Sequence, residues 1–409
     1  MIWRKRNLVR KLVLLVSILS AAVCLSGTIF AADWPRFLGP SANGFAPDTR
    51  ISKDWTANPP KVLWSVPLTD GGYAGVSSAA GKVFVIDHKG NQDIVRAIDI
   101  KTGKDVWTYP YDDTDKENGG FARATPTFDS GRLYTQSRPG ILNCLDAKTG
   151  KPIWSRDLVK EFSGRRPGWD YAFSPFVDRD RLIVLPGGEK AGIVALDKKT
   201  GKTLWQNGGN APSYSTPVAA KIMGRPQYVI FDSVGLQGVD VATGAQLWSF
   251  PWKTGSDCNA ATPIVMGDSI YITTGYGHGC AVVDVTKDGA KLRWQNKEMQ
   301  AHFSSPIFYK GYVYGNSDPG TLVCIDPKDG TVKWKKEGFG KGALVGVDGV
   351  LIALNGSGGD VVMVKLVPDS YQEIGRFKPL EGDCWTAPIV TNGRLVVRDK
   401  KKIVCVALK

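Results

Sequence analysis

The chain has 409 residues, including 47 Gly and 13 Trp, and a formal net charge of +13. Five of its 52 Lys and Arg residues and none of its 39 acidic residues precede Asp33, so the remainder carries only +8. Basic and acidic residues alternate there, apart from one short run at 400–402, which argues against a nucleic-acid partner. Abundant Gly and Trp with few helix-period stretches indicate short strands joined by tight turns, and therefore an all-β fold.

The first 32 residues have the pattern of an export signal. A basic stretch precedes an apolar run at 12–23, and Ala31-Ala32 offers a small-residue cleavage point. We therefore predict a signal peptide at 1–32 and a periplasmic or extracellular protein with no membrane span after cleavage. Two alternatives stay open, namely retention of this segment as an anchor and lipidation at Cys24, although a Val precedes that Cys instead of a small residue.

One nine-residue pattern recurs along the chain. It reads DIKTGKDVW at 99–107, DAKTGKPIW at 146–154, DKKTGKTLW at 197–205 and DVATGAQLW at 240–248, with looser copies at 284–294 and 326–334. The Trp residues that end these copies, together with Trp64, are spaced by 40 to 51 residues. A period of this size in a strand-rich sequence indicates a ring of four-stranded blades, a β-propeller.

Each copy of the pattern is expected to form a hairpin. The Asp carboxylate can accept backbone N–H groups across the turn, and the Gly can adopt the left-handed conformation that closes it. The Trp then lies on the outermost strand, where its ring can pack against the next blade and its N–H can reach a carbonyl. The pattern therefore predicts seven blade-docking tryptophans: Trp64, Trp107, Trp154, Trp205, Trp248, Trp294 and Trp334.

A second signal marks the start of each blade. It is a Thr-Pro, Ser-Pro or Ala-Pro pair at 125–126, 174–175, 216–217, 262–263, 305–306 and 387–388, with 77–79 and 343–344 in the equivalent places of the first and seventh units. Pro is tolerated early in a strand where the ladder does not need its missing N–H. Eight starts predict eight blades, although the seventh unit has Phe377 in place of the Trp.

The two ends of the repeat region complete one another. Residues 61–66 have the pattern of an outer strand with no blade before them, and the last unit stops at 402–409 without an outer strand. Pairing of these segments would close the ring and remove exposed sheet edges. We therefore predict an irregular segment at 33–60 followed by an eight-bladed β-propeller at 61–409.

The recurring Ala/Cys-Leu-Asp-x-x-Thr-Gly-x-x-x-Trp pattern resembles the tryptophan-docking repeat of the pyrroloquinoline quinone (PQQ)-type β-propellers. The resemblance covers nearly the whole chain after residue 32, and the stretch WPRFLGPSANGF is similar to the N-terminal segment of such proteins. That superfamily includes quinoprotein alcohol dehydrogenases and also cofactor-free members, such as the lipoprotein of the β-barrel assembly machinery. The resemblance implies the fold and leaves the activity open.

The catalytic members of that superfamily commonly carry an adjacent Cys-Cys disulfide over the quinone, a calcium ion held by Glu, Asn and Asp, a base Asp and a Trp floor. This chain has neither an adjacent Cys pair nor a C-x-x-C-H haem motif. These differences argue against an enzyme of that type. No cofactor is therefore expected, and PQQ with calcium stays open as the alternative.

The Cys and His residues show no catalytic pattern. Three Cys residues at the same place in their blades are expected to be small buried hydrophobes, namely Cys144, Cys324 and Cys405. Export permits a disulfide between Cys258 and Cys280. The histidines lack metal-ligand spacing: they are His88, His278 and His302.

Inner strands of a propeller converge on its channel, so the residues just before each blade start should ring one mouth. They are Tyr73, Arg123, Asp170, Tyr171, Tyr214, Asn259, His302, Asp383 and Trp385. We take Arg123, Tyr171, Tyr214, Asn259, His302 and Trp385 as candidate ligand-binding residues, because aromatic and polar groups together suit a planar or anionic small molecule or a peptide segment. In the enzyme alternative, Asp170 or Asp383 would act as base and Asn259 would bind the metal. Arg123 would then face the quinone oxygens, and Trp385 would stack on the quinone.

Two functions are compatible with this sequence. The leading hypothesis is an exported, monomeric propeller that acts as a non-catalytic binding or scaffold protein for a protein or cell-envelope partner. The alternative is a small PQQ- and calcium-dependent alcohol or sugar dehydrogenase with its site at the channel mouth.

Overall fold

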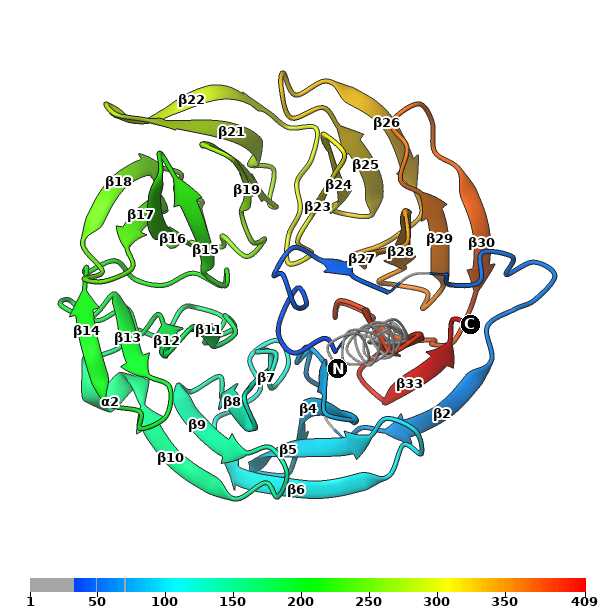
Figure 1. Ribbon diagram of the computed structural model, residues 1–409, viewed down its shortest axis with the longest axis horizontal. Helices are drawn as coiled ribbons and strands as arrows, with labels where there is room; N and C mark the ends of the chain where they lie inside the picture. The colour runs from blue at the N-terminus through cyan, green and yellow to red at the C-terminus, as the bar shows by residue number, and fades with distance from the viewer. Residues whose placement is uncertain (1–32, 49, 70) are drawn as a thin grey trace, which may run out of the picture. The chain divides into compact units, whose positions relative to one another are not determined.

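The computed structural model describes residues 33–48, 50–69 and 71–409, so the predicted signal peptide at 1–32 lies outside the described residues. Eight sheets surround a central channel (Figure 1), which confirms the predicted eight-bladed β-propeller. The described ranges contain one short helix, α2 (Leu158–Phe162). In these ranges there is no helix that is long and apolar enough to cross a membrane.

Seven blades each use four consecutive strands, numbered here from the channel outward. Blade 1 has β3 (Ser77–Ala79), β4 (Lys82–Lys89), β5 (Gln92–Asp99) and β6 (Asp105–Asp112), and blade 2 has β7 (Thr127–Asp129), β8 (Arg132–Gln136), β9 (Ile141–Asp146) and β10 (Pro152–Asp157). Blade 3 has β11 (Phe176–Asp178), β12 (Arg181–Val184), β13 (Ile193–Asp197) and β14 (Thr203–Asn207), and blade 4 has β15 (Val218–Ile222), β16 (Arg225–Phe231), β17 (Gly235–Asp240) and β18 (Gln246–Pro251).

The next three blades repeat this order. Blade 5 has β19 (Ile264–Met266), β20 (Ser269–Thr274), β21 (Gly279–Thr286) and β22 (Gly289–Asn296), and blade 6 has β23 (Ile307–Tyr309), β24 (Tyr312–Ser317), β25 (Thr321–Ile325) and β26 (Val332–Glu337). Blade 7 has β27 (Ala343–Val347), β28 (Val350–Leu354), β29 (Val361–Lys365) and β30 (Glu373–Phe377). The seventh unit is therefore a blade, as predicted.

Blade 8 combines both ends of the propeller. Its inner three strands are β31 (Ile389–Thr391), β32 (Arg394–Arg398) and β33 (Lys402–Ala407). Its outer strand is β2 (Val62–Pro67), which pairs antiparallel with β33 and sets Trp64 opposite Cys405. This pairing confirms the predicted ring closure, because β2 covers the edge that β33 would otherwise expose.

Six of the seven predicted docking tryptophans form a hydrogen bond to the next blade. The indole N–H of each donates to a backbone carbonyl there at 2.9 to 3.3 Å: Trp64 to Ile100, Trp107 to Ala147, Trp154 to Lys198, Trp205 to Val241, Trp294 to Pro327 and Trp334 to Val367. All of these rings except that of Trp334 also lie close to the turn Gly of the next blade, and a Cβ added at Gly150, for example, would stand 2.6 Å from Trp107. Gly thus suits this turn for two reasons: it readily adopts a positive φ, and it has no Cβ to obstruct the Trp ring.

Trp248 belongs to a buried cluster that includes residues of blades 4 and 5, but its hydrogen bond differs from those of the other six. Its indole N–H donates to Gln227 Oε1 of its own blade at 2.6 Å. The following blade closes its outer hairpin by pairing Thr286 with Gly289 and has no Thr-Gly turn.

A β-bulge accompanies every docking position. In all eight blades the register between the third and the outer strand shifts next to the docking residue or its equivalent, for example between Pro152 and Trp154 in β10. A bulge re-aims the side chain beside it. In blade 7 this register position holds Gly375, opposite Met363, and not Phe377 as the sequence pattern suggested. Trp55 lies against it, 2.7 Å from an added Cβ, and packs edge-on against Phe377 with 5.1 Å between ring centroids.

Residues 33–48, which we call the strap, cross one end of the channel (blue in Figure 1). Trp34 forms a β-bridge with Ser78, and Arg36 Nη1 donates to the Val177 carbonyl at 2.8 Å. The strap then forms β1 (Phe45–Ala46), a parallel fifth strand beside β27. The segment predicted to be irregular therefore contains a strand.

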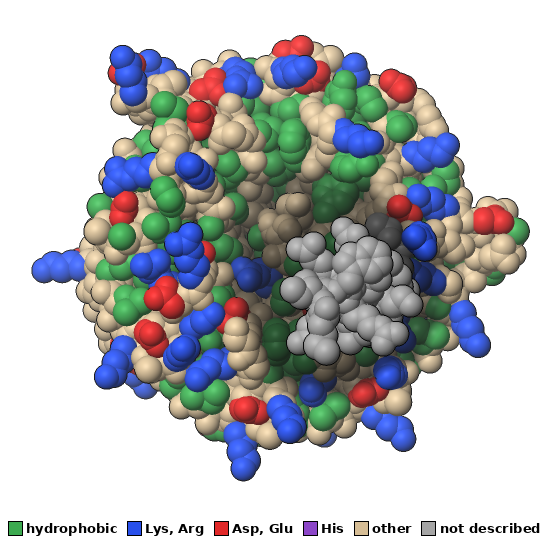
Figure 2. Space-filling view, viewed as in Figure 1, with side chains coloured by type: hydrophobic (Ala, Val, Ile, Leu, Met, Phe, Trp, Pro, Cys, Tyr) green, Lys and Arg blue, Asp and Glu red, His purple; other side chains and the backbone are tan. Residues whose placement is uncertain are grey.

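The hydrophobic core lies between blades. One buried cluster joins Tyr134 of blade 2, Val194 of blade 3 and Tyr228 of blade 4. Another includes Trp34 and Trp55 together with residues of blades 1, 7 and 8. On the face that Figure 2 shows, Lys and Arg side chains are interspersed with acidic ones, as the sequence predicts.

Candidate functional site at the channel mouth

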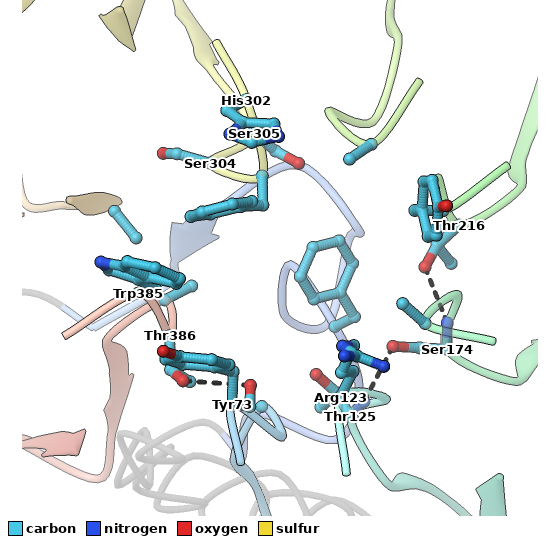
Figure 3. A pocket seen from close by; sticks show the side chains of 18 of the residues that line it. Tyr73, Arg123, Thr125, Ser174, Thr216, His302, Ser304, Ser305, Trp385 and Thr386 are labelled. Atoms are coloured by element: carbon cyan, nitrogen blue, oxygen red, sulfur yellow. Dashed lines mark hydrogen bonds between the residues drawn. The ribbon is translucent and has the colours of Figure 1, made fainter. Parts of the chain in front are cut away.

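A cavity of about 510 Å³ occupies the channel. Trp34, Phe37 and Leu38 of the strap contribute to its lining, and most of its other lining residues precede or begin the inner strands of the blades. The strap bonds to the middle or far end of several inner strands, so it lies opposite the residues that precede them. Figure 3 shows side chains from several blades converging on this space. The cavity is therefore a cup whose floor is the strap.

Ser and Thr hydroxyls join neighbouring inner strands around the cup. The N–H of Thr125 donates to Ser174 Oγ, and the N–H of Ser174 donates to Thr216 Oγ1, each at 3.0 Å (Figure 3). Thr262 and Ser305 repeat this bond at 3.0 Å. The Ser/Thr-Pro marker of the sequence thus starts a blade and also fastens it to the previous one.

Three aromatic rings, which we call the aromatic column, form one side of the cup: Tyr73, Trp385 and Phe303. Tyr73 and Trp385 are stacked, with 4.7 Å between ring centroids and 12° between planes (Figure 3). Phe303 lies 5.1 Å from Trp385 at 31°. His302 and Tyr276 continue the aromatic contacts at 4.2 and 4.4 Å. The column gives the cup a continuous apolar wall.

Two ammonium groups lie over this column. Lys341 Nζ is 5.6 Å from the ring centroid of Phe303 and 5.8 Å from that of Trp385. Lys400 Nζ is 4.8 Å from the centroid of Tyr73 and 5.9 Å from that of Trp385. These distances fall within the range of cation–π attraction. Both lysines line the cavity, so flat apolar surface and positive charge adjoin there.

Acidic residues partner the two lysines from outside the lining. Lys341 lies 3.6 Å from Asp318 and Lys400 lies 3.5 Å from Asp383, measured between nitrogen and carboxylate oxygen. Contact with the Tyr73 hydroxyl raises the pKa of Lys400, so this group stays charged. Asp383 was expected in the ring of mouth residues, yet it is not part of the cavity lining.

Arg123 lines the cavity as expected, but backbone carbonyls occupy its guanidinium. Nη1 donates to the Trp169 carbonyl at 2.6 Å, and Nη2 donates to the carbonyls of Asn118 and Gly120. Arg123 Nη1 also lies 3.5 Å from Asp170. These contacts hold two mouth loops together, so Arg123 positions the rim and has few donors left for a ligand.

Asp170 was expected at the mouth, and the structure places it in a buried ion-pair network instead. Its Oδ2 accepts from Arg138 at 3.3 Å, and its Oδ1 accepts from Arg166 at 2.5 Å. Asn118 also donates to Oδ2 at 3.3 Å. With 4% of its surface exposed and both oxygens engaged, Asp170 is not placed to remove a proton from a molecule in the cup.

Tyr171 and Asn259 also point away from the cup. The Tyr171 hydroxyl donates to the Pro186 carbonyl at 2.8 Å in the blade interior. Asn259 Nδ2 donates to the carbonyl of Asp232 at 2.7 Å, and its Oδ1 accepts from Thr274 at 3.0 Å. Both residues are fully buried and absent from the lining.

Tyr73, Arg123, Tyr214, His302 and Trp385 are the predicted mouth residues that the structure brings together at the cup. The sequence reading missed several others that line it: Trp34, Phe37, Glu117, Trp169, Cys258, Tyr276, Phe303, Lys341 and Lys400. Tyr276 and Lys400 lie in turns between the second and third strands of their blades, which return to the same mouth. Strand alternation could have identified those turns.

Cys258 and His302 form a close pair in the cup. Cys258 Sγ is 3.6 Å from His302 Nε2, and Lys341 Nζ is 3.5 Å from Nδ1. Burial and Lys341 lower the pKa of His302 to about 4, and burial raises the pKa of the Cys258 thiol to about 11. An ammonium at Nδ1 leaves the ring proton on Nε2, facing the thiol. This pair is therefore an unionised thiol beside a neutral imidazole, not an activated nucleophile.

The donor set of the cup does not fit a calcium-bound quinone. Calcium takes six to eight oxygen ligands in typical sites. Among the described residues that line the cavity, the one carboxylate is Glu117. A second expectation from the sequence also fails: Cys258 and Cys280 are both free thiols, so they do not form the disulfide that export would permit. The ligand set required by the enzyme alternative is not assembled here.

A second polar cluster lies between blades 1 and 2. Ligand atoms of His88, Asp93 and Asp113 fall within 4.8 Å of one another, a grouping that sequence spacing did not reveal. Arg138 binds Asp113 through two bonds at 2.7 and 3.1 Å, and Asp93 accepts from Tyr111 at 3.2 Å and contacts His88 at 2.9 Å. Burial raises the pKa of Asp93 to about 6. The cluster satisfies itself with protein groups and links the blades.

A family model described as "Outer membrane protein assembly factor BamB" matches residues 91–336, from blade 1 to blade 6. The outer membrane protein assembly factor BamB of Yersinia pestis is 26% identical over 310 residues, which cover 68% of this chain and 72% of that protein. The alcohol dehydrogenase (quinone) dehydrogenase subunit of Komagataeibacter europaeus is 29% identical over only 126 residues, 28% of this chain and 17% of that protein.

Solved structures of both classes share the fold. The crystal structure of BamB from Moraxella catarrhalis has a TM-score of 0.63 and 19% identity, and the match covers 85% of this chain and 99% of that chain. The quinohemoprotein alcohol dehydrogenase from Comamonas testosteroni has a TM-score of 0.52 and 14% identity, with 92% and 80% covered. Fold alone does not separate the two classes. The family model covers more than half of the sequence, and the chain therefore belongs to the family of the outer membrane protein assembly factor BamB.

Proposed function

We propose that this protein is a non-catalytic scaffold of the cell envelope that binds protein partners in outer-membrane protein assembly. The family match over residues 91–336 carries this proposal, because the relatives are named for that process. The export signal predicted at 1–32 would deliver the propeller to the periplasm, where it would act as a monomer, either free or anchored by a retained or lipidated N-terminus. No cofactor is needed for such a role.

The chemistry of the cup supports binding over catalysis. Its thiol is unionised, its imidazole carries a proton on the side of that thiol, and the carboxylate of Asp170 is held by arginines. A nucleophile or base that is already engaged in such contacts contributes little to proton transfer. The aromatic rings of the lining and the ammonium groups of Lys341 and Lys400 are suited to binding a partner.

The mouth is the face we assign to the partner. Trp169 and Tyr276 line the cup and are 45% and 55% exposed, which is unusual for large aromatic side chains. Aromatic residues are enriched at the centres of protein interfaces. A rigid ring of blades holds the loops that carry them.

Site-specific photo-crosslinking in the source organism tests this function. A photoreactive phenylalanine analogue replaces Trp169 or Tyr276 in the full chain, and adducts are identified by mass spectrometry after irradiation. Matched controls carry the analogue at Val106 or Ile153, which are 48% and 44% exposed on outer strands. They report non-specific capture at equally exposed apolar positions.

We expect adducts with a component of the outer-membrane β-barrel assembly machinery, or with one of its substrates, from the two mouth positions and not from the outer-strand positions. Absence of such adducts from both mouth positions would overturn the assignment of this face. If the chain gave no adduct with any assembly component from any of the four positions, the scaffold role itself would be contradicted.

A further inference from the structure

The lining of the cup is unbalanced in charge. Lys341 and Lys400 line it together with Arg123, and among the described residues that line it the one acidic side chain is Glu117. Arg123 is occupied by carbonyls, as described above. The two lysines are each about one third exposed, so they are accessible from the cavity while remaining partly desolvated. A ligand in the cup therefore meets two ammonium groups whose carboxylate partners lie outside the lining.

The same lysines are tied to the apolar wall. Each Nζ lies within 6 Å of the ring centroid of Trp385, and each also lies over a second ring of the aromatic column. The acidic partners Asp318 and Asp383 are 3.5 to 3.6 Å away and outside the lining. An anion that enters from the cavity side can bind the same two ammonium groups, and it need not displace Asp318 or Asp383.

The cup has the size of a small-molecule site. Its volume of about 510 Å³ falls within the ~300–1,000 Å³ typical of ligand pockets. Phe37 of the strap lines the same cavity, so a flat molecule would meet a further aromatic ring besides those of the column. Such surroundings favour an aromatic body over a purely polar one.

We propose that the cup binds an organic anion with an aromatic body, held without a metal ion. The body packs against Tyr73, Trp385 and Phe303, and the acidic group is paired with Lys341 and Lys400. This inference does not rest on the scaffold function, because it concerns the interior of the cup and not the partner at its rim.

A pair of fluorescent probes that differ by one charged group tests the proposal. The anion 8-anilinonaphthalene-1-sulfonate and its neutral analogue N-phenyl-1-naphthylamine share one aromatic body. We expect saturable one-to-one binding of the sulfonate to the purified propeller. Combined substitution of Lys341→Gln and Lys400→Gln is expected to weaken the sulfonate at least tenfold and to leave the neutral probe within twofold.

Two lysines outside the cup provide the matched control. Lys310 and Lys336 also lie over aromatic rings, at 5.3 Å from Tyr309 and 5.7 Å from Tyr371, and neither lines the cavity. The double variant Lys310→Gln and Lys336→Gln loses the same charge and should bind both probes like the unmodified protein. Thermal unfolding of both double variants checks that each remains folded.

Rising salt should weaken the sulfonate and leave the neutral probe unchanged, because mobile ions screen the ammonium groups. Trp385→Ala should weaken both probes, because it removes the centre of the aromatic column. The proposal is overturned if the sulfonate binds with several equivalent weak sites, or if the cup variant and the control variant lower its affinity equally. Neither result would bear on the crosslinks expected at Trp169 and Tyr276.

Discussion

Gly in the repeated turn is constrained twice, by its backbone and by its neighbour. Gly150 has a φ of +75°, and the indole of Trp107 from the previous blade lies against it. Asp146 completes the turn, because its Oδ1 accepts from the N–H groups of Lys148 and Thr149 and from the Thr149 hydroxyl at 2.7 to 3.1 Å. These bonds, led by that from the Thr149 hydroxyl, lower the pKa of Asp146. The repeat is therefore a docking device at the level of single atoms.

The first prediction separates these two constraints on Gly. Gly131 has a φ of +80° in the same blade and nothing within 4 Å of an added Cβ, whereas the Cβ at Gly150 would stand 2.6 Å from Trp107. Gly131→Ala should cost about 1–2 kcal/mol of unfolding free energy from the left-handed backbone alone. Gly150→Ala should cost a further ~1–3 kcal/mol, because the added methyl displaces the indole. Chemical denaturation of both variants measures the difference, and equal losses would contradict the docking role of Gly150.

The second prediction concerns His302. Burial, and then Lys341, lower its pKa to about 4. The pKa of His in an unfolded chain is about 6.5. Between pH 6.5 and 4, therefore, His302 is protonated in the unfolded chain and neutral in the folded chain. Stability from this group is therefore present above pH 6.5 and is lost as the pH falls toward 4. The chain has only three His residues, so an NMR titration resolves them.

We expect Lys341→Gln to raise the pKa of His302, since it removes a positive neighbour, while burial keeps the pKa below the ordinary value. His302→Gln identifies the resonance, and the stability of that variant should depend less on pH between 4 and 6.5. A midpoint near 6.5 for His302 in the unmodified protein would contradict the geometry of the cup.

The candidate residues at the mouth show how far sequence reasoning reached at this scale. Counting back from each blade start placed Tyr73, Tyr214 and Trp385 correctly on the wall. It could not distinguish Asp170 from its neighbours, because the direction of this side chain depends on Arg123 and Arg138, which come from other loops. Contacts between distant segments decide such orientations, and a repeat pattern carries no information about them.

At the scale of elements, the outer strand of one blade and the inner strands of its neighbours carry different interactions. Outer strands have a β-bulge at the docking residue, and the indole N–H of that residue donates to a carbonyl of the next blade, as Trp107 does to Ala147. Inner strands are joined near the channel by Ser and Thr hydroxyls, as between Thr125 and Ser174. The sequence revealed the Ser/Thr-Pro marker, but a hydroxyl that accepts from another blade cannot be recognised before the register is known.

The strap was the least predictable element. It has no repeat, and only two of its residues form a strand, β1 beside β27. Its apolar residues resemble those of any irregular segment, yet Trp34 is 3% exposed and forms part of the floor of the cup. The pairing depends on where the chain crosses the channel, which is a property of the closed ring.

The third prediction tests closure by β2. A chain that begins at Ile51 keeps β2, whereas a chain that begins at Gly71 lacks it and leaves the edge of β33 unpaired. Loss of buried Trp64 alone should cost ~3–5 kcal/mol, and the open edge should promote self-association. Size-exclusion chromatography and thermal unfolding compare the two chains. A synthetic peptide of residues 59–69 should raise the unfolding temperature of the shorter chain, because it binds the folded state.

Identical size and stability of the two truncated chains would argue against closure by β2. The chain beginning at Ile51 is the matched control, because both truncations remove the strap and differ in the residues around β2. Loss of the strap therefore cannot explain a difference between them.

At the scale of the whole molecule, the sequence was sufficient for the architecture. Docking repeats spaced by 40 to 51 residues, eight blade starts and two complementary ends allow only a closed eight-bladed ring. Function is less accessible, because BamB and a quinohemoprotein alcohol dehydrogenase share this fold, and a fold alone does not determine an activity. Here the mouth presents aromatic rings and lysines, and Glu117 is the one carboxylate in the described lining.

We propose that this ring binds partners and does not catalyse quinone-dependent oxidation. Equilibrium dialysis of the purified protein with PQQ and calcium, followed by dye-coupled assays with alcohols and sugars, tests it most directly. We predict no calcium-dependent binding of PQQ and no substrate-dependent dye reduction, and any quinone retained by the lysines should bind equally well with a calcium chelator present. One-to-one binding of PQQ that requires calcium, together with turnover of an alcohol or sugar, would contradict the account.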